Sequence, residues 1–266
     1  MPEVTKPLPK ATPSGAAIIA REDGASIAYH RLAGRAPGVM FLAGFKSDMT
    51  GVKAMGVENF CRRRGRAFLR FDYFGHGESS GNFDEGTIGR WAGDAIFAID
   101  NLIDGPLVLV GSSMGGWLML LTALARPERI AGLIGIAAAP DFTQGLIEDA
   151  LTPEQKDVIK RDGVVTVANE YDPNDPFVIR QSFIDEGRNH LLLGDTIPLD
   201  CPVRLLHGLN DREVPFATAL RLAEKLRTDD VEITLVKNGD HRLSTPADIE
   251  RLSATLERLL GRLDAT

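Results

Sequence analysis

Two hydrophobic patterns alternate along this chain and predict its secondary structure. Short segments are almost uniformly apolar, which is typical of strands buried on both faces of a sheet. Longer segments carry apolar residues at the spacing of an amphipathic helix. The expected strands are residues 16–20, 26–32, 38–43, 67–71, 107–110, 130–138, 201–206 and 231–236. The expected helices are residues 49–64, 87–103, 114–125, 215–226 and 246–263, the last with Thr245 as its cap.

The alternation of strands and helices predicts an α/β fold, with a mostly parallel central sheet and helices on both of its faces. Residues 16–20 and 26–32 are the exception, because the turn Glu22-Asp23-Gly24 between them suits an antiparallel pair. Crossovers in a parallel sheet are right-handed, and catalytic groups collect at the carboxyl ends of its strands. A polar residue directly after a strand is therefore a candidate for a catalytic site.

The alternation stops at residues 141–199, where the pattern predicts two short helices and no convincing strand. Thr152-Pro153-Glu154-Gln155 is a capping box that opens a helix to about Asp162, and Asp175-Pro176 opens a second helix that ends near Gly187. So long a segment favours a helical lid over the catalytic crevice, and the alternative is a crossover with an extra turn. Residues 1–15, with four prolines, are expected to be a flexible N-terminal segment before a single domain at 16–266.

Composition and charge limit the classes of partner and the location. The chain has 266 residues, of which 44% are hydrophobic, and this suits one globular domain. A net charge of −7 argues against a nucleic-acid partner. No apolar stretch is long enough for a membrane span, and residues 1–15 lack the apolar core of a signal peptide. Cys61 in an expected helix and Cys201 at a strand start indicate reduced thiols, and hence a cytosolic setting. The sequence indicates no oligomeric state.

The stretch Gly111-Ser112-Ser113-Met114-Gly115 is interpreted as a nucleophile elbow, a sharp turn that exposes a serine hydroxyl above the end of a strand. Small residues are needed there because the strand and the following helix approach too closely for side chains. The pattern alone arises readily by chance in a chain with 27 glycines. The expected strand before it and the expected helix after it favour the elbow, which makes Ser113 the candidate nucleophile.

A serine nucleophile needs a base within hydrogen-bond reach and an acid that orients the base. Asp211 and His241 are the candidates, because each directly follows an expected strand, as Ser113 does. The developing oxyanion needs two N–H donors. The backbone N–H groups of Phe45, in the loop after an expected strand, and of Met114, the residue after the nucleophile, are predicted to supply them.

Other residues compete for these roles. Ser112 is interpreted as a polar turn residue, and Asp141, shortly after the strand that ends at Ala138, is a second position for the acid. His207 is interpreted as a buried, hydrogen-bonded structural residue. Four further residues are given no role, namely His76 and Asp240 as loop residues, and His30 and His190, which no pattern supports.

No cofactor and no metal are expected. No group of histidines or cysteines has the spacing of metal ligands, and no glycine-rich loop opens a helix in a dinucleotide-binding context. A serine rather than an aspartate at the nucleophile position argues against hydrolysis of epoxides or haloalkanes.

Five segments together carry a resemblance to a known family, namely residues 38–51, 68–79, 110–120, 201–208 and 240–242. They resemble the α/β-hydrolase superfamily, and within it the serine hydrolase subgroup that contains a mitochondrial acyl-protein depalmitoylase, also described as an acyl-glucuronide esterase, and its bacterial relatives. The resemblance implies an α/β-hydrolase fold and a hydrolase of carboxylic esters or thioesters, with Ser113 as nucleophile, His241 as base and Asp211 as its partner. The chain departs from that subgroup in lacking an evident mitochondrial presequence and in the composition of its lid, so the acyl group is not implied.

Two other functions remain open on the sequence. A ligand-binding protein of the same fold would keep these residues without turnover. A small serine peptidase would be expected to carry a propeller or a larger cap domain.

Overall fold

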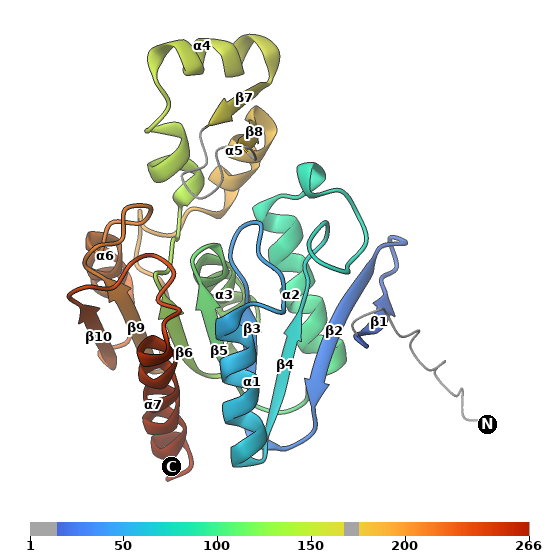
Figure 1. Cartoon of the computed structure of the whole chain (residues 1–266), viewed down its shortest axis with the longest axis vertical. Coiled ribbons are helices and arrows are strands. Elements are labelled where there is room, and N and C mark those ends of the chain that lie inside the picture. Colours follow the sequence, from blue (N-terminus) through green and yellow to red (C-terminus); the bar gives the residue numbers. More distant parts are fainter. Residues whose placement is uncertain (1–14, 168–175, 266) are drawn as a thin grey trace.

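The computed structural model describes residues 15–167 and 176–265. Its centre is an eight-stranded sheet in the order β1-β2-β4-β3-β5-β6-β9-β10 (Figure 1). The strands are β1 Ala17–Ala20, β2 Ser26–Leu32, β3 Arg35–Leu42, β4 Arg66–Phe71, β5 Leu107–Ser112, β6 Ile130–Ile136, β9 Val203–Gly208 and β10 Val231–Val236. Every residue of β5 is buried, as expected for a central strand that is covered on both faces.

Strand directions confirm the predicted sheet. Strand β2 pairs antiparallel with β1 and with β4, whereas the neighbours from β4 to β10 pair in parallel. The carboxyl ends of the parallel strands therefore lie along one edge of the sheet, where the candidate residues were expected.

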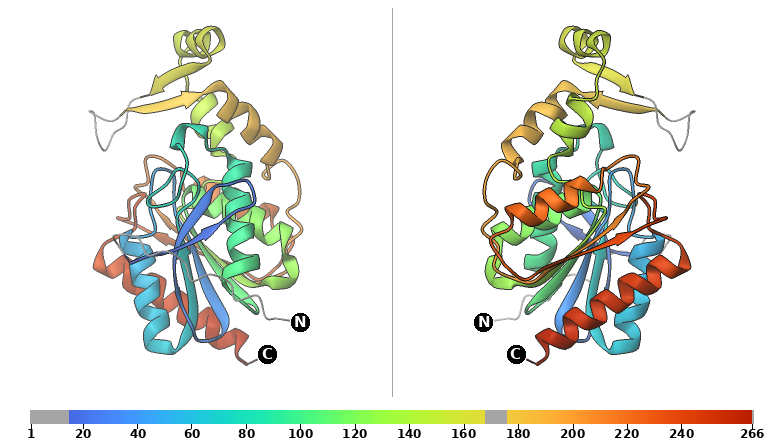
Figure 2. Two further views of the ribbon diagram at one scale, coloured as in Figure 1. Left: turned by 90° about the vertical axis from the view of Figure 1, so that its right-hand side faces the viewer. Right: turned by 90° about the vertical axis from the view of Figure 1, so that its left-hand side faces the viewer.

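Helices cover both faces of the sheet (Figure 2). One face carries α1 Val52–Arg64 and α7 Pro246–Leu263, and the other carries α2 Ile88–Leu102, α3 Met114–Ala125 and α6 Ala217–Lys225. Helix α7 begins where expected, because the Thr245 hydroxyl accepts the Asp248 N–H and the Asp248 carboxylate accepts the Thr245 N–H. The predicted fold class is thus confirmed.

The segment at residues 141–199, between β6 and β9, is an insertion into the alternating pattern and stands above the carboxyl ends of the parallel strands (Figure 1). Its elements are a π-helical turn at Thr143–Glu148, α4 Pro153–Asp162, β7 Val164–Val167, β8 Phe177–Arg180, α5 Gln181–Gly187 and a short 3-10 turn at Arg188–His190. Helix α4 has the predicted capping box. The role of this segment as a lid stays a prediction, and so does the single domain.

The expectation of no strand in this segment is wrong. Strands β7 and β8 form an antiparallel pair, and the helix expected from Asp175 begins only at Gln181; Asp175 itself lies outside the described residues. Along β8 the side chains alternate, with Val178 exposed and Ile179 buried. The pair buries Val165 and Ile179 in a small core of the insertion that is completed by Leu151, Ile159 and Ile184.

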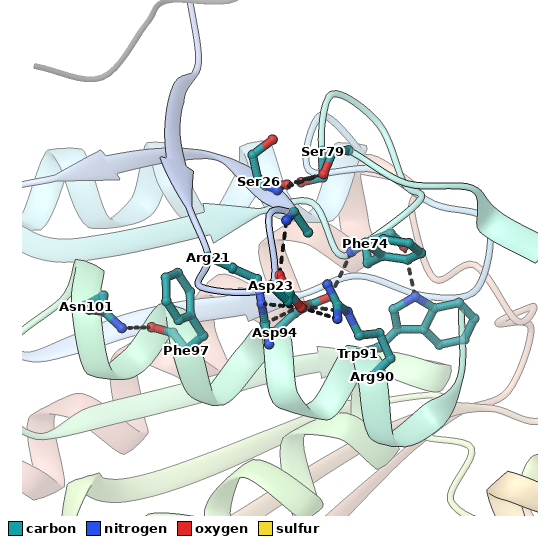
Figure 3. A network of polar contacts seen from close by, with 12 residues as sticks. Arg21, Asp23, Ser26, Phe74, Ser79, Arg90, Trp91, Asp94, Phe97 and Asn101 are labelled. Carbon is teal, nitrogen blue, oxygen red and sulfur yellow. Dashed lines mark hydrogen bonds and ion pairs between the residues drawn. The ribbon is translucent and has the colours of Figure 1, made fainter. Parts of the chain in front are cut away.

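A buried polar network ties the turn between β1 and β2 to α2 (Figure 3). Asp94 of α2 accepts hydrogen bonds from Arg21 Nη1 at 2.5 Å and from the Phe74 N–H at 2.8 Å. Burial raises the pKa of Asp94 to about 6, although the Phe74 N–H, Arg21 and Arg90 all favour its charged form. Trp91 Nε1 donates to Phe74 O at 3.0 Å. The network therefore fixes the loop after β4 against α2.

Within the described residues, no helix is both long and apolar enough to cross a membrane.

Candidate active site

Ser113 occupies a strained turn between β5 and α3. Its backbone has φ 55° and ψ −122°, a conformation that a residue with a side chain rarely adopts. Three backbone hydrogen bonds hold it there. The Ser113 N–H donates to Ile136 O at 2.9 Å, and Ser113 O accepts the N–H groups of Gly116 at 2.8 Å and Ala139 at 3.1 Å. The turn is therefore the elbow predicted from the sequence.

The glycines of the elbow are required by close backbone contacts. A Cβ on Gly111 would lie 2.3 Å from Gly115 O, and a Cβ on Gly115 would lie 2.1 Å from Leu42 O. Both distances are far below van der Waals contact. The glycines thus allow α3 to start directly against β3 and β5, and this aims Ser113 at the carboxyl edge of the sheet.

The structure brings Ser113, His241 and Asp211 together, as predicted. His241 Nε2 lies 3.0 Å from Ser113 Oγ, and His241 Nδ1 lies 2.8 Å from Asp211 Oδ2. With an uncharged His241 imidazole, this geometry lets the serine hydroxyl donate to Nε2 while Nδ1–H donates to the carboxylate. Asp211 follows β9 and His241 follows β10, so neighbouring strands supply the acid and the base.

Asp211 lies in a dense set of hydrogen-bond donors. Its Oδ1 accepts the N–H groups of Glu213 at 3.0 Å and Val214 at 2.9 Å, and its Oδ2 lies 3.1 Å from His207 Nε2. Burial opposes the charge, but the hydrogen bonds from His207 and His241 outweigh it and hold the pKa of Asp211 well below its usual range. Asp211 is therefore a carboxylate at neutral pH.

His207 is buried and hydrogen-bonded, which confirms its structural interpretation. Its Nε2 also lies 2.9 Å from Val214 O, so this nitrogen carries a proton that it shares between a carbonyl and Asp211. The sequence did not reveal the contact with Asp211. The spacing of four residues between His207 and Asp211 was the available signal, because a strand end followed by a tight turn folds back on itself.

The two predicted oxyanion donors lie beside the nucleophile. Met114 follows Ser113 directly, and Phe45 follows Gly44, where an added Cβ would lie 3.3 Å from Ser113 Cβ. Within the described part of the chain, neither the Phe45 N–H nor the Met114 N–H donates a hydrogen bond. Both N–H groups are therefore available as hydrogen-bond donors beside Ser113, and their role as oxyanion donors stays a prediction.

Aromatic rings surround the Phe45 side chain. The ring centroids of Phe83, Trp91, Phe142, Phe177 and Phe183 lie 4.9 to 6.0 Å from that of Phe45. Phe177 and Phe183 belong to the insertion, so the insertion and the core share this cluster. A space scarcely larger than a water molecule requires lies among Phe45, Phe83, Trp91 and Phe183. Arg180 and Asp84, which form an ion pair at 3.5 Å, also line it.

The competing candidates lie elsewhere or make other contacts. Asp141 Oδ1 and Oδ2 accept the N–H groups of Leu192 and Leu193, both at 2.8 Å, so Asp141 anchors the end of the insertion. Asp240 is exposed and accepts the Leu243 N–H. Ser112 ends β5 and is buried.

The remaining histidines also lie outside the Ser113 cluster. His76 is not a simple turn residue, because it is buried among the rings of Tyr73, Phe83 and Trp91 and burial lowers its pKa to about 4. His30 lies in β2. His190 Nε2 lies 2.7 Å from Glu186 Oε1 in the insertion.

Comparison with known proteins identifies the family and agrees with the fold. Residues 39–253 match the model of the alpha/beta hydrolase family. The chain is 45% identical over 245 residues to the palmitoyl-protein thioesterase ABHD10, mitochondrial, of Mus musculus, which covers 91% of this chain and 82% of that protein.

Two solved structures are similar over nearly their whole length. The alpha/beta hydrolase domain-containing protein 10 from mouse superposes with a TM-score of 0.88 at 43% identity, covering 93% of this chain and 99% of that one. A protein from Agrobacterium vitis S4 superposes with a TM-score of 0.86 at 37% identity, covering 92% of this chain and 97% of that one. The resemblance stated from the sequence is thereby confirmed.

The same comparison contradicts the cytosolic setting expected from the sequence, because the curated relatives are described as mitochondrial. Cys61 and Cys201 are indeed free thiols, and burial raises their pKa to about 12 and about 11. Unreactive reduced thiols suit any reducing compartment. They indicate the redox state of the surroundings and do not distinguish one such compartment from another.

Proposed function

The chain belongs to the alpha/beta hydrolase family, and from that premise we propose that it is a serine hydrolase that cleaves carboxylic esters or thioesters at Ser113. One observation carries the proposal. A continuous line of hydrogen bonds runs from Asp211 through His241 to the hydroxyl of a serine held in a strained elbow. This arrangement makes an otherwise weak nucleophile reactive at neutral pH.

The proposed reaction has two halves. Ser113 Oγ attacks the acyl carbonyl carbon while His241 Nε2 takes its proton, and the Asp211 carboxylate stabilises the resulting imidazolium. The tetrahedral oxyanion accepts hydrogen bonds from the Phe45 and Met114 N–H groups. The alcohol or thiol then leaves with a proton from His241. A water molecule activated by His241 releases the acid from Ser113.

An acyl thioester is the preferred substrate within this class. The Mus musculus relative is described as a palmitoyl-protein thioesterase, and the aromatic cluster around Phe45 provides an apolar environment suited to an acyl chain. A thiolate leaves with less help from a general acid than an alkoxide does.

Ser113→Ala tests the nucleophile directly. The variant is expected to lose hydrolysis of p-nitrophenyl esters and acyl thioesters by about 10⁶-fold, and to lose labelling by a fluorophosphonate probe. Ser112→Ala is the matched control, because it removes the neighbouring hydroxyl, and it should still be labelled. Full activity in Ser113→Ala would refute the proposal. In the parent protein, a burst of p-nitrophenol without steady turnover would instead support a ligand-binding protein.

A further inference from the structure

Lys53 of α1 reaches across the molecule to the loop that carries His241. Its Nζ donates to Arg242 O at 2.5 Å and lies 3.2 Å from Ser244 Oγ, although the lysine and Arg242 are 189 residues apart in the sequence. The Ser244 hydroxyl donates to the same carbonyl at 2.8 Å. The peptide group between Arg242 and Leu243, one residue beyond His241, is therefore held from α1.

The helix itself does not account for a lysine at this position. Lys53 is the second residue of α1, where a positive charge opposes the helix dipole. The first turn of α1 contains no acidic residue, and Gly51 supplies no side-chain cap. Burial, followed by the charge of Arg242, lowers the pKa of Lys53 to about 8, while Asp240 and Asp248 act in the opposite direction. The ammonium group is thus placed at a cost to the fold.

The rest of the His241 loop is confined on its inner side. Gly239 lies against β9, because a Cβ on Gly208 would be 2.3 Å from Gly239 O. Leu243 is buried with φ 42°, a left-handed conformation that strains a residue with a side chain. His241 lies between these two points. The strained Leu243 is held at its N–H by the Asp240 carboxylate, and the peptide group before it is held by Lys53 through Arg242 O.

We propose that Lys53 is a positioning residue, which holds the Arg242 carbonyl so that His241 Nε2 stays within hydrogen-bond reach of Ser113. The inference rests on the proposed function of Ser113 and His241. Lys53 touches neither the substrate nor the reacting atoms. Lys53 reduces the conformational freedom of His241 in both halves of the reaction. Loss of the lysine therefore lowers the rate of the chemical steps and leaves binding of the acyl group unchanged.

Lys53→Met tests the inference, because methionine keeps much of the length of the side chain and removes the donor. We expect kcat for a p-nitrophenyl ester to fall by about tenfold to a hundredfold with KM within about twofold of the parent. The rate of fluorophosphonate labelling at Ser113 should fall by the same factor. Lys53→Arg, which restores a charged donor, should recover most of both rates. Lys53 is half-buried, so the lost hydrogen bond and the removed charge have opposite effects on stability, and the Tm of Lys53→Met should stay close to that of the parent at pH 7.

Lys225→Met is the matched control. Lys225 Nζ also donates to a backbone carbonyl, that of Gly194 at 3.1 Å, which does not belong to the loop that carries His241. Its loss should leave kcat unchanged. Parental kcat in Lys53→Met overturns the inference, and so does a fall in activity that matches a fall in Tm and is not recovered by arginine. Failure of the proposed function is distinguishable, because the parent would then neither turn over nor be labelled at Ser113.

Discussion

Asp211 shows how much of the site depends on a single charge. Four groups donate to or contact its carboxylate, namely the N–H groups of Glu213 and Val214, and the rings of His207 and His241. An amide at this position would keep an acceptor oxygen for His241 but would lose the charge that stabilises the imidazolium. It could also favour the wrong tautomer of the base.

Asp211→Asn is therefore expected to lower kcat for esters and thioesters by about 10⁴-fold while the protein remains folded. Stopped-time assays and fluorophosphonate labelling measure the loss, and near-UV circular dichroism checks the fold. A loss of less than about tenfold would mean that His241 does not depend on this carboxylate.

The same variant should change how the fold responds to acid. In the folded protein the pKa of Asp211 lies well below the ordinary aspartate value of 3.8, because hydrogen bonds from His207 and His241 outweigh the effect of burial. The carboxylate therefore stabilises the fold above about pH 4, and this contribution is lost as the pH falls below that value. The Tm of Asp211→Asn should fall less than that of the parent between pH 7 and pH 3. An identical acid dependence of Tm in both proteins would contradict the lowered pKa.

The site residues divide into those that a sequence can predict and those that it cannot. Ser113, Asp211 and His241 each follow a strand, so the rule that parallel strands end at one edge was sufficient to bring them together. No such rule predicts the contact of Lys53 with Arg242 O, because that contact depends on how closely α1 packs to a loop 189 residues further along the chain. The contact of His207 with Asp211 depends on the shape of one turn.

At the level of elements, α3 and the strands around it tolerate almost no added volume. Gly115→Ala would place a Cβ 2.1 Å from a backbone oxygen of β3, which cannot move as a side chain could. We expect a loss of about 2–3 kcal/mol in the free energy of unfolding, measured by urea titration. Labelling of Ser113 should also slow, because the elbow would shift.

Gly93→Ala is the matched comparison for that variant. Gly93 lies inside α2, and a Cβ there would meet nothing within 4 Å. Alanine is the better helix former, so this variant should gain about 0.5–1 kcal/mol. Equal effects of the two substitutions would show that the close contact at Gly115 is not what makes glycine necessary there.

Elements with local signals were predicted well, and those without them were not. Helix α4 begins at the predicted capping box and α7 at the predicted cap Thr245, since the residues that form a cap lie within four positions of one another. The strand pair β7 and β8 was missed because each strand has only four residues. In so short a run, apolar residues fit helical and strand spacing equally well, and only packing against the rest of the insertion decides between them.

At the level of the whole molecule, the insertion is fixed at its base and has its own small core farther out. Asp141 holds the N–H groups of Leu192 and Leu193, and Glu186 accepts the N–H of Gly89 in the first turn of α2. Five residues outside this base, Leu151, Ile159, Val165, Ile179 and Ile184, form the separate core. Between the two regions, Phe183 and Phe177 reach down to Phe45. These two rings therefore connect the insertion to the loop that carries the proposed oxyanion donor, the Phe45 N–H.

Phe183 offers a way to ask whether this aromatic cluster sets the length of acyl chain that the site accepts. Its ring packs against Phe45, Trp91 and Phe142. The space among Phe45, Phe83, Trp91 and Phe183 holds little more than a water molecule. A long acyl chain must displace rings from this cluster, whereas a short one need not. Phe183→Ala removes one ring and should raise the ratio of kcat/KM for a long-chain thioester to that for an acetyl thioester by about tenfold, on the scale of about 1.4 kcal/mol of binding energy.

Ile184→Ala distinguishes the effect of added space beside Phe45 from the effect of a less stable insertion. Ile184 is the next residue and is equally buried, but it packs in the small core of the insertion and not against Phe45. Both truncations lower stability, by about 2–5 kcal/mol, so both loosen the insertion. Only Phe183→Ala enlarges the space beside the oxyanion donor, so only it should change the ratio of long-chain to short-chain turnover. If Ile184→Ala raised the ratio as much, movement of the whole insertion, and not the volume occupied by Phe183, would control which acyl groups reach Ser113.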